Sequence, residues 1–244
     1  RIAESRPQPN AVNLATVTAN LAALLHLLGQ PGKAERRYEQ ALKLQEELYG
    51  AEHPGLAPLL TNVSAFYATR ADFEQAELLA LRAAELAERG NDDRAVLSAL
   101  LRLSDAHLKR GKLDEAEQRL ARARTLGEKL RGSEPQMYAQ VLLRLVELHR
   151  ERKHYVRAIE LAREAMAVFE RALGPNHPSL ANALDLVSAL HGSSGAYGPA
   201  RIAAERALAI RQQVLGSGHP ENVVNLTNLA MIAKRSGDTR RALY

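Results

Sequence analysis

The chain has 244 residues, of which 46% are hydrophobic and 25% are charged, a composition typical of a folded protein that works in water. It contains no cysteine, which excludes disulfide bonds and cysteine-based metal sites or nucleophiles and fits a cytoplasmic location. No stretch approaches the about 18 uninterrupted apolar residues of a membrane span, so we expect no membrane partner.

A six-fold internal repeat organises the sequence. An alanine recurs at steps of 42, 40, 42, 42 and 42 residues, and another alanine follows seven residues after each of the first five. These anchor alanines are Ala34, Ala76, Ala116, Ala158, Ala200 and Ala242. The period predicts one array of stacked helical units, with boundaries near 11–52, 53–90, 91–132, 133–174, 175–216 and a truncated 217–244. Because residues 1–6 read as the end of a helix, we expect a fragment of a longer protein.

Each unit is expected to hold two helices. In the first unit, apolar residues between Leu14 and Leu28 recur at steps of three and four, as on one face of a helix. The second helices are expected to begin near residues 33, 73, 113, 155 and 197. Small side chains at the anchor positions allow the two helices of a unit to approach closely.

The linkers between units carry helix-end signals. Glycine precedes a proline at 48–54, 130–135, 173–178 and 215–220. We expect the glycine to end one helix in a left-handed conformation and the proline to begin the next helix. At 89–93 the proline is missing, and Asp92 or Asp93 is expected to cap instead. Three linkers also carry a histidine, which we interpret as a turn residue because equivalent positions lie too far apart to share a metal ion.

These features together resemble the tetratricopeptide repeat, in the 42-residue form of kinesin light chain. The resemblance rests on Asn-Leu-Ala at 20–22 and 228–230, Tyr-Glu-Gln-Ala-Leu at 38–42, and Leu-Gly-Pro-Asn-His-Pro at 173–178. It implies an all-α fold, a right-handed superhelical α-solenoid of about six helix-turn-helix units. It also implies a non-catalytic scaffold or signalling module that binds other proteins. No P-loop, zinc-protease or serine-hydrolase motif is present, so we expect no enzyme, no cofactor and no metal site.

The resemblance further implies that the first helix of each unit lines a concave groove. Residues 18, 15, 14, 11, 8 and 7 positions before each anchor share one helical face. The position 14 before the anchor, together with its neighbours on that face, supplies the candidate groove residues Asn20, Asn62, Arg102, Asp105, Lys109, Arg144, Glu147, Leu186, Ala189 and Asn228.

Each residue type suggests a different contact with a ligand. In the family the asparagine contacts the main chain of bound peptides, and a carboxamide both donates and accepts hydrogen bonds. Arg102 and Arg144 are expected to pair with acidic ligand side chains, or instead with Asp105 and Glu147 within the protein. Around Ala189 the small residues predict a recess for an apolar side chain. The expected partner is therefore a peptide or protein segment with acidic and apolar residues.

Two other functions were weighed. Residues 91–163 hold 16 basic and 11 acidic side chains, which suggests a nucleic-acid surface. The mixed charge favours an ion-paired, solvated helix surface instead, and the aromatic content of 4% disfavours base stacking. The open ends of the array are candidates for self-association, which would make the chain an oligomer.

Overall fold

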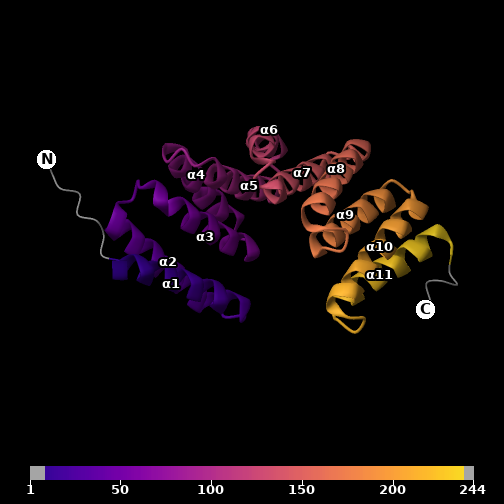
Figure 1. Cartoon of the computed structure of the whole chain (residues 1–244), viewed down its shortest axis with the longest axis horizontal. Coiled ribbons are helices and arrows are strands. Elements are labelled where there is room, and N and C mark those ends of the chain that lie inside the picture. The colour runs from indigo at the N-terminus through magenta and orange to yellow at the C-terminus, as the bar shows by residue number, and fades with distance from the viewer. Residues whose placement is uncertain (1–8, 239–244) are drawn as a thin grey trace. The chain divides into compact units, whose positions relative to one another are not determined.

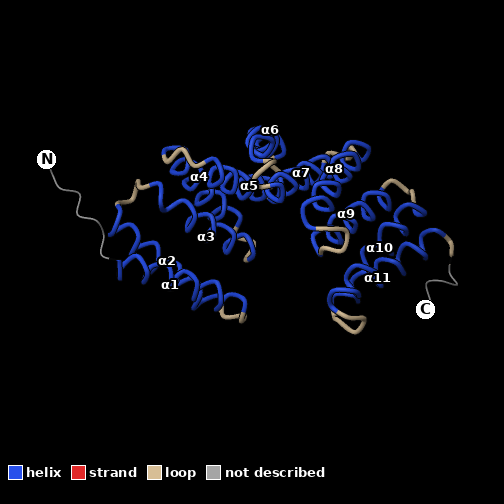
Figure 2. Tube along the Cα trace, in the orientation of Figure 1, coloured by secondary structure: helices blue, strands red, loops and turns tan. Residues whose placement is uncertain are grey.

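The computed structural model describes residues 9–238, and within them the chain is all-α (Figure 1). The last anchor, Ala242, and the helix end expected at 1–6 lie outside the described residues. Short loops join the helices (Figure 2). Eleven α-helices and one short 3-10 helix, η1, are described: α1 Pro9–Leu27, α2 Pro31–Tyr49, η1 Pro54–Leu56, α3 Ala57–Thr69, α4 Phe73–Arg89, α5 Asp93–Lys109, α6 Leu113–Leu130, α7 Pro135–Glu151, α8 Tyr155–Leu173, α9 Pro178–Ser193, α10 Tyr197–Leu215 and α11 Glu221–Ser236.

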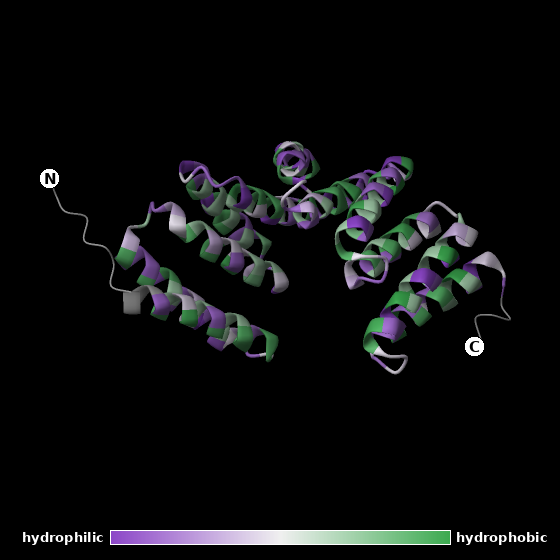
Figure 3. Ribbon diagram, viewed as in Figure 1, coloured by the Kyte–Doolittle hydropathy of each residue, from purple (hydrophilic) through white to green (hydrophobic). Residues whose placement is uncertain are grey.

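The chain forms two compact units, the first ending at Ala123 and the second beginning at Arg124, so that the division falls inside α6. In the first unit, α1 packs on α2 and α3 packs on α4; in the second, α7 packs on α8 and α9 packs on α10. These are the helix pairs that the 42-residue period predicts. Hydrophobic and hydrophilic residues alternate around the helices (Figure 3), as expected when one face is packed and another is wet.

The anchor alanines pack the helices of each pair together. Ala34, Ala76, Ala158 and Ala200 are all buried, with at most 1% of their surface exposed. The alanines seven residues later are equally buried. Because these side chains are small, the backbones approach closely enough for Ser64 Oγ to donate a hydrogen bond to the Ala76 carbonyl, at 2.7 Å. The predicted role of the anchors is confirmed in the described part of the chain.

The turn inside each pair requires one residue with a positive φ, at the position five before the anchor. Glycine fills it in four repeats, and Ala71 and Lys153 fill it with φ of 60° each. A side chain is disfavoured in this conformation because its Cβ crowds the following carbonyl. The same turn therefore forms even where the sequence does not offer glycine, because the packing on both sides holds it.

The linkers between pairs differ in one respect from expectation. Gly50, Gly174 and Gly216 do end their helices with positive φ, at 88° to 89°. Their ψ values of 150°, 166° and 153° place them in an extended region and not in the left-handed helical one. Gly132 is not among the positive-φ residues. Essentially only glycine adopts this combination of a positive φ and a large ψ, so another residue at these linker positions would be strained.

The linker histidines are helix caps. Nδ1 of His53, His177 and His219 accepts a hydrogen bond from the backbone N–H two residues later, at 3.0, 3.1 and 3.3 Å. Each imidazole thus satisfies one of the N–H groups that a helix start leaves without a partner. Where the His-Pro is missing, Asp92 caps α5 by accepting from the N–H groups of Arg94 and Ala95, both at 3.0 Å. The expectation that these are turn histidines is confirmed.

Ion pairs connect the second helix of one repeat to the next repeat. Glu46 pairs with Arg82 at 2.7 Å, and Glu170 pairs with Arg206 at the same distance. Nearer the turns, Glu35 pairs with Arg70 at 2.6 Å. All of these side chains are at least 29% exposed, so solvent screens them and each contributes little stability. These ion pairs lie at the contact between repeats but are not the main source of its stability.

Candidate functional site

The first unit contains a recess between α1 and α3, on the face where the groove is expected. Its volume is about 320 Å³. The residues that line it are Ala19, Asn20, Ala23, His26, Leu27, Tyr38, Asn62, Ala65, Phe66 and Thr69. Two predicted groove residues, Asn20 and Asn62, are thus brought to one recess from neighbouring repeats.

Aromatic rings form the floor of this recess. Phe66 is buried, and its ring centroid lies 5.2 Å from those of both His26 and Tyr38. Burial raises the pKa of the Tyr38 phenol, so this side chain stays neutral. His26 also contacts Thr69 Oγ1 through Nε2 at 3.0 Å. The small side chains of Ala23 and Ala65 leave the floor open to a ligand.

The asparagines of the recess differ from other asparagines in the chain. Asn20 and Asn62 are exposed and have no hydrogen-bond partner within residues 9–238. By contrast, Asn222 donates to the Gly216 and Ser217 carbonyls, and Asn225 is buried with both its donor and its acceptor engaged. The recess therefore presents two complete carboxamides, each able to donate and accept.

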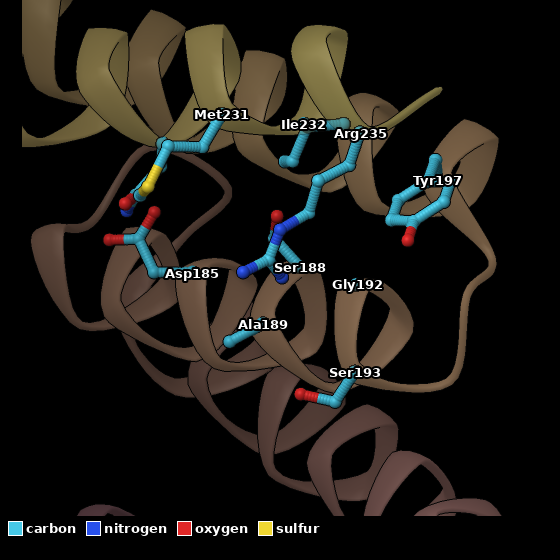
Figure 4. A pocket seen from close by; sticks show the side chains of 10 residues that line it. Asp185, Ser188, Ala189, Gly192, Ser193, Tyr197, Met231, Ile232 and Arg235 are labelled. Atoms are coloured by element: carbon cyan, nitrogen blue, oxygen red, sulfur yellow. The ribbon is translucent and has the colours of Figure 1, made fainter. Parts of the chain in front are cut away.

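The second unit contains a recess of about 230 Å³ among α9, the start of α10 and α11 (Figure 4). Ala189 and Gly192 form one side of it, as the small residues of this repeat predicted. Asn228, Met231 and Arg235 come from α11. Leu186 is half-buried and is not among the residues that line the recess.

Asp185 also lines this recess, but its carboxylate already has partners within the protein. Its Oδ2 pairs with the Arg211 guanidinium at 2.6 Å, and its Oδ1 accepts from Asn225 at 2.6 Å. Arg211 also donates to Asn182 and Asn225, both at 2.7 Å, and its side chain is 10% exposed. This network joins α9, α10 and α11, and so it fixes the geometry of the recess.

Arg235 is the cation that remains available there. Figure 4 shows its side chain reaching from α11 toward Ser188 and Ala189 of α9. It has no acidic partner within the described residues. The sequence places Arg235 seven residues before the last anchor, on the predicted groove face, but its identity as an unpaired cation depends on the packing of α11. The sequence pattern alone does not single it out.

The charged candidates on α5 and α7 behave differently. Arg102 Nη1 lies 3.6 Å from Asp105 Oδ2, one helical turn away, and their side chains are 41% and 24% exposed. The internal pairing that we considered for Arg102 therefore exists. Lys109 is exposed on the same helix. On α7, Arg144 and Glu147 are both half-buried.

Neither a metal cluster nor a membrane-spanning helix is found. Within residues 9–238, no group of three or more histidine, aspartate and glutamate side chains is arranged to hold a metal ion. No helix there is long and apolar enough to cross a membrane.

Several solved structures resemble this one. They include BtubC from P. vanneervenii (TM-score 0.69, 21% identity, covering 99% of this chain and 87% of that one) and a kinesin light chain candidate from Podosopora anserina (TM-score 0.68, 18% identity, 85% and 98%). A Rap protein complexed with competence and sporulation factor is also similar (TM-score 0.70, 15% identity, 94% and 72%). At these identities the likeness shows the fold.

Sequence comparison identifies the family. Human tetratricopeptide repeat protein 19, a mitochondrial protein, is 34% identical over 62 residues, which is 25% of this chain and 16% of that protein. The family model described as "Tetratricopeptide repeat" matches residues 13–89, 95–170 and 137–213. These matches cover most of the described helices, and the chain belongs to the tetratricopeptide-repeat family.

Proposed function

We propose that the inner faces of the first helices bind an extended peptide segment of a partner protein, and that the chain is a non-catalytic interaction module. The observation that carries the proposal is the pair of unpartnered carboxamides, Asn20 and Asn62, above an open aromatic floor. An extended peptide has unsatisfied N–H and C=O groups at regular intervals, and carboxamides match both. The Rap protein that was solved with a bound factor supports the same use of this fold.

The recess of the second unit adds a preference for side chains. Arg235 suits a ligand carboxylate, and the space beside Ala189 and Gly192 suits an apolar or aromatic side chain. We therefore propose that the bound segment carries an acidic residue near an apolar one. Arg102 and Arg144 remain proposed contacts to further acidic residues, with Arg102 giving up its intrahelical contact to Asp105 on binding. Lys109, Glu147 and Leu186 also remain predictions, as do the six repeat boundaries, the single array and a cytoplasmic location.

The experiment begins with a displayed library of random peptides selected on the 244-residue chain, followed by fluorescence anisotropy of the best binder. The double variant Asn20→Ala, Asn62→Ala removes two ligand hydrogen bonds of about 1 kcal/mol each, so we expect a loss of at least about tenfold in affinity. Asn176→Ala, in the exposed linker before α9, is the matched control and should bind normally. Parental affinity in the double variant would refute the role of this recess.

The second recess is tested separately. Ala189→Trp fills the space at an exposed position, so it should block binding of the apolar side chain while the array stays folded. Arg235→Glu should weaken binding of acidic peptides and spare a peptide whose acid is replaced by glutamine. The pair Arg102→Glu, Arg144→Glu should abolish binding of an acidic ligand. If a peptide binds all of these variants with the parental affinity, it does not bind this face.

The nucleic-acid alternative gains no support from the basic region. Of the 16 basic side chains in 91–163, at least seven form ion pairs with acidic side chains. Pairing lowers the local positive charge that phosphate binding requires. This region is better described as the ion-paired helix surface that its mixed composition predicts.

A further inference from the structure

The first helix carries an uncovered apolar stripe on a face other than the groove. The α1 stripe consists of Leu14, Val17, Leu21, Leu24 and Leu28, whose side chains are 52%, 62%, 38%, 51% and 62% exposed. Their spacing of three, four, three and four is that of the contact seam between two coiled helices. Figure 3 shows hydrophobic residues along this helix. Such a continuous apolar surface marks a place where another element docks.

The equivalent positions of later repeats show what kind of element docks there. In the second repeat, the positions 20, 17, 13 and 10 before the anchor are occupied by four side chains that are at most 5% exposed: Leu56, Leu59, Val63 and Phe66. The last three pack against Tyr38 and Ala41 of the preceding second helix, α2. The same face of α1 is therefore shaped to pack against another helix, and nothing within residues 9–238 covers it.

Another repeat of the same kind would dock on this face without the two ion pairs that the second repeat makes with α2. The second repeat receives α2 through Arg70 and Arg82, six positions before and six after its anchor, which pair with Glu35 and Glu46. In the first repeat these two positions hold Leu28 and Gln40. The two arginines are therefore missing, and one of them is replaced by a residue that lengthens the apolar stripe.

The charge beside the stripe defines the partner more closely. A depression of about 530 Å³ borders it, lined by Leu21, Leu25, Lys33, Arg36, Arg37 and Gln40. Lys33 and Arg36 have no acidic partner in the described part of the chain, and Arg37 donates only to Gln40, at 2.7 Å. The sequence from residue 7 to 32 contains no acidic side chain. The stripe is therefore apolar along its length and basic along one edge.

We propose that the α1 stripe binds an amphipathic helix of a partner protein, with apolar residues at a seven-residue period and acidic residues along one edge. The apolar seam covers Leu14 to Leu28, and the acidic edge faces Lys33 and Arg36. A second copy of this chain is a poorer occupant, because two basic edges would then be brought to the same interface. Binding here is independent of the groove, because the recess between α1 and α3 uses other side chains of α1.

The test uses two synthetic 21-residue peptides with identical leucine seams, one with glutamates and one with lysines along the edge. Both are dye-labelled and titrated at low salt with the 244-residue chain, and hydrogen exchange maps the protected segment. We expect the glutamate peptide to bind at least about tenfold more tightly than the lysine peptide and to protect α1. Equal affinities, protection elsewhere, or no binding by either peptide would overturn the proposal.

Two variants separate the stripe from other apolar surface. Leu21→Glu with Leu24→Glu should abolish binding of the glutamate peptide without lowering Tm, because both positions are exposed in the free chain. Val156→Glu, on the 76% exposed surface of α8, is the matched control and should bind normally. Sedimentation of the free chain completes the test: a dimer that disappears in the double variant would show that a second copy takes the stripe, and the proposal would be wrong.

Discussion

Arg211 is the side chain on which the second recess depends most. Its guanidinium pairs with Asp185 at 2.6 Å and donates to Asn182 and Asn225. Replacing Arg211 with alanine leaves the Asp185 carboxylate in a site built for a cation. Removing one partner of a buried ion pair costs about 3–5 kcal/mol. Because Asp185 is itself 27% exposed and water can reach it, we expect a loss near the lower limit, about 3 kcal/mol.

Arg211→Ala should loosen α11 locally as well as lower the free energy of unfolding of the whole chain. Among the described helices α11 packs chiefly on α10, so losing the network should free α11 first. Hydrogen exchange of α11 amides is expected to accelerate in Arg211→Ala, while exchange in α7 and α8 stays near the parental rate. Chemical denaturation gives the total change in the free energy of unfolding.

A double-mutant cycle with Asp185→Asn isolates the pair. If the network carries the stability, the double variant Arg211→Ala, Asp185→Asn should recover part of the loss, because no buried charge is left alone. A change below about 1 kcal/mol for Arg211→Ala would refute the reasoning, since it would mean that water compensates the carboxylate as well as the guanidinium does.

Three further predictions concern the turns and the packing between repeats. Lys153→Gly should raise the free energy of unfolding by about 0.5–1 kcal/mol in denaturant titration, since relief of a positive φ outweighs the added freedom of the unfolded chain; a decrease would contradict it. His177→Ala should cost about 1 kcal/mol by removing a cap, and His177→Asp, which can still accept from the Ser179 N–H, should restore most of it. Tm should fall on acidification in two stages, which thermal melts between pH 7.5 and 3.5 would follow. Burial lowers the pKa of His107 from its ordinary 6.5, so the unfolded chain binds the proton first and stability is lost as the pH drops below about 6.5. Burial alone would raise the pKa of Glu77, but the hydrogen bond from Lys112 and the nearby positive charges lower it below 4.5, so a second loss follows below that pH. His107→Gln should reduce the first stage without abolishing it, because burial also lowers the pKa of His191, and a flat melt profile in the parent would refute both stages.

The helix pairs and their turns were predictable from the sequence because their determinants are local. A three- and four-residue apolar period, an anchor alanine and a capping Asp92 act over a few residues, and each recurs several times, so one degenerate copy does not obscure the pattern. The family followed from the same recurrence. The φ of Lys153 was predictable only through its register with Gly29 and Gly195, because nothing about a lysine favours that conformation.

The availability of each polar side chain was decided by tertiary structure alone. Asn20 and Asn225 are the same residue type on first helices of the array, yet one is exposed and unpartnered and the other is buried against Arg211 and Asp185. Arg211 and Arg235 differ in the same way. A side chain is free or occupied according to what the neighbouring helices bring within about 3 Å of it, and those neighbours are 14 to 40 residues away in the sequence. The sequence by itself determined the helices and the face that each presents, whereas packing between repeats determined which groups on that face are left to bind a partner.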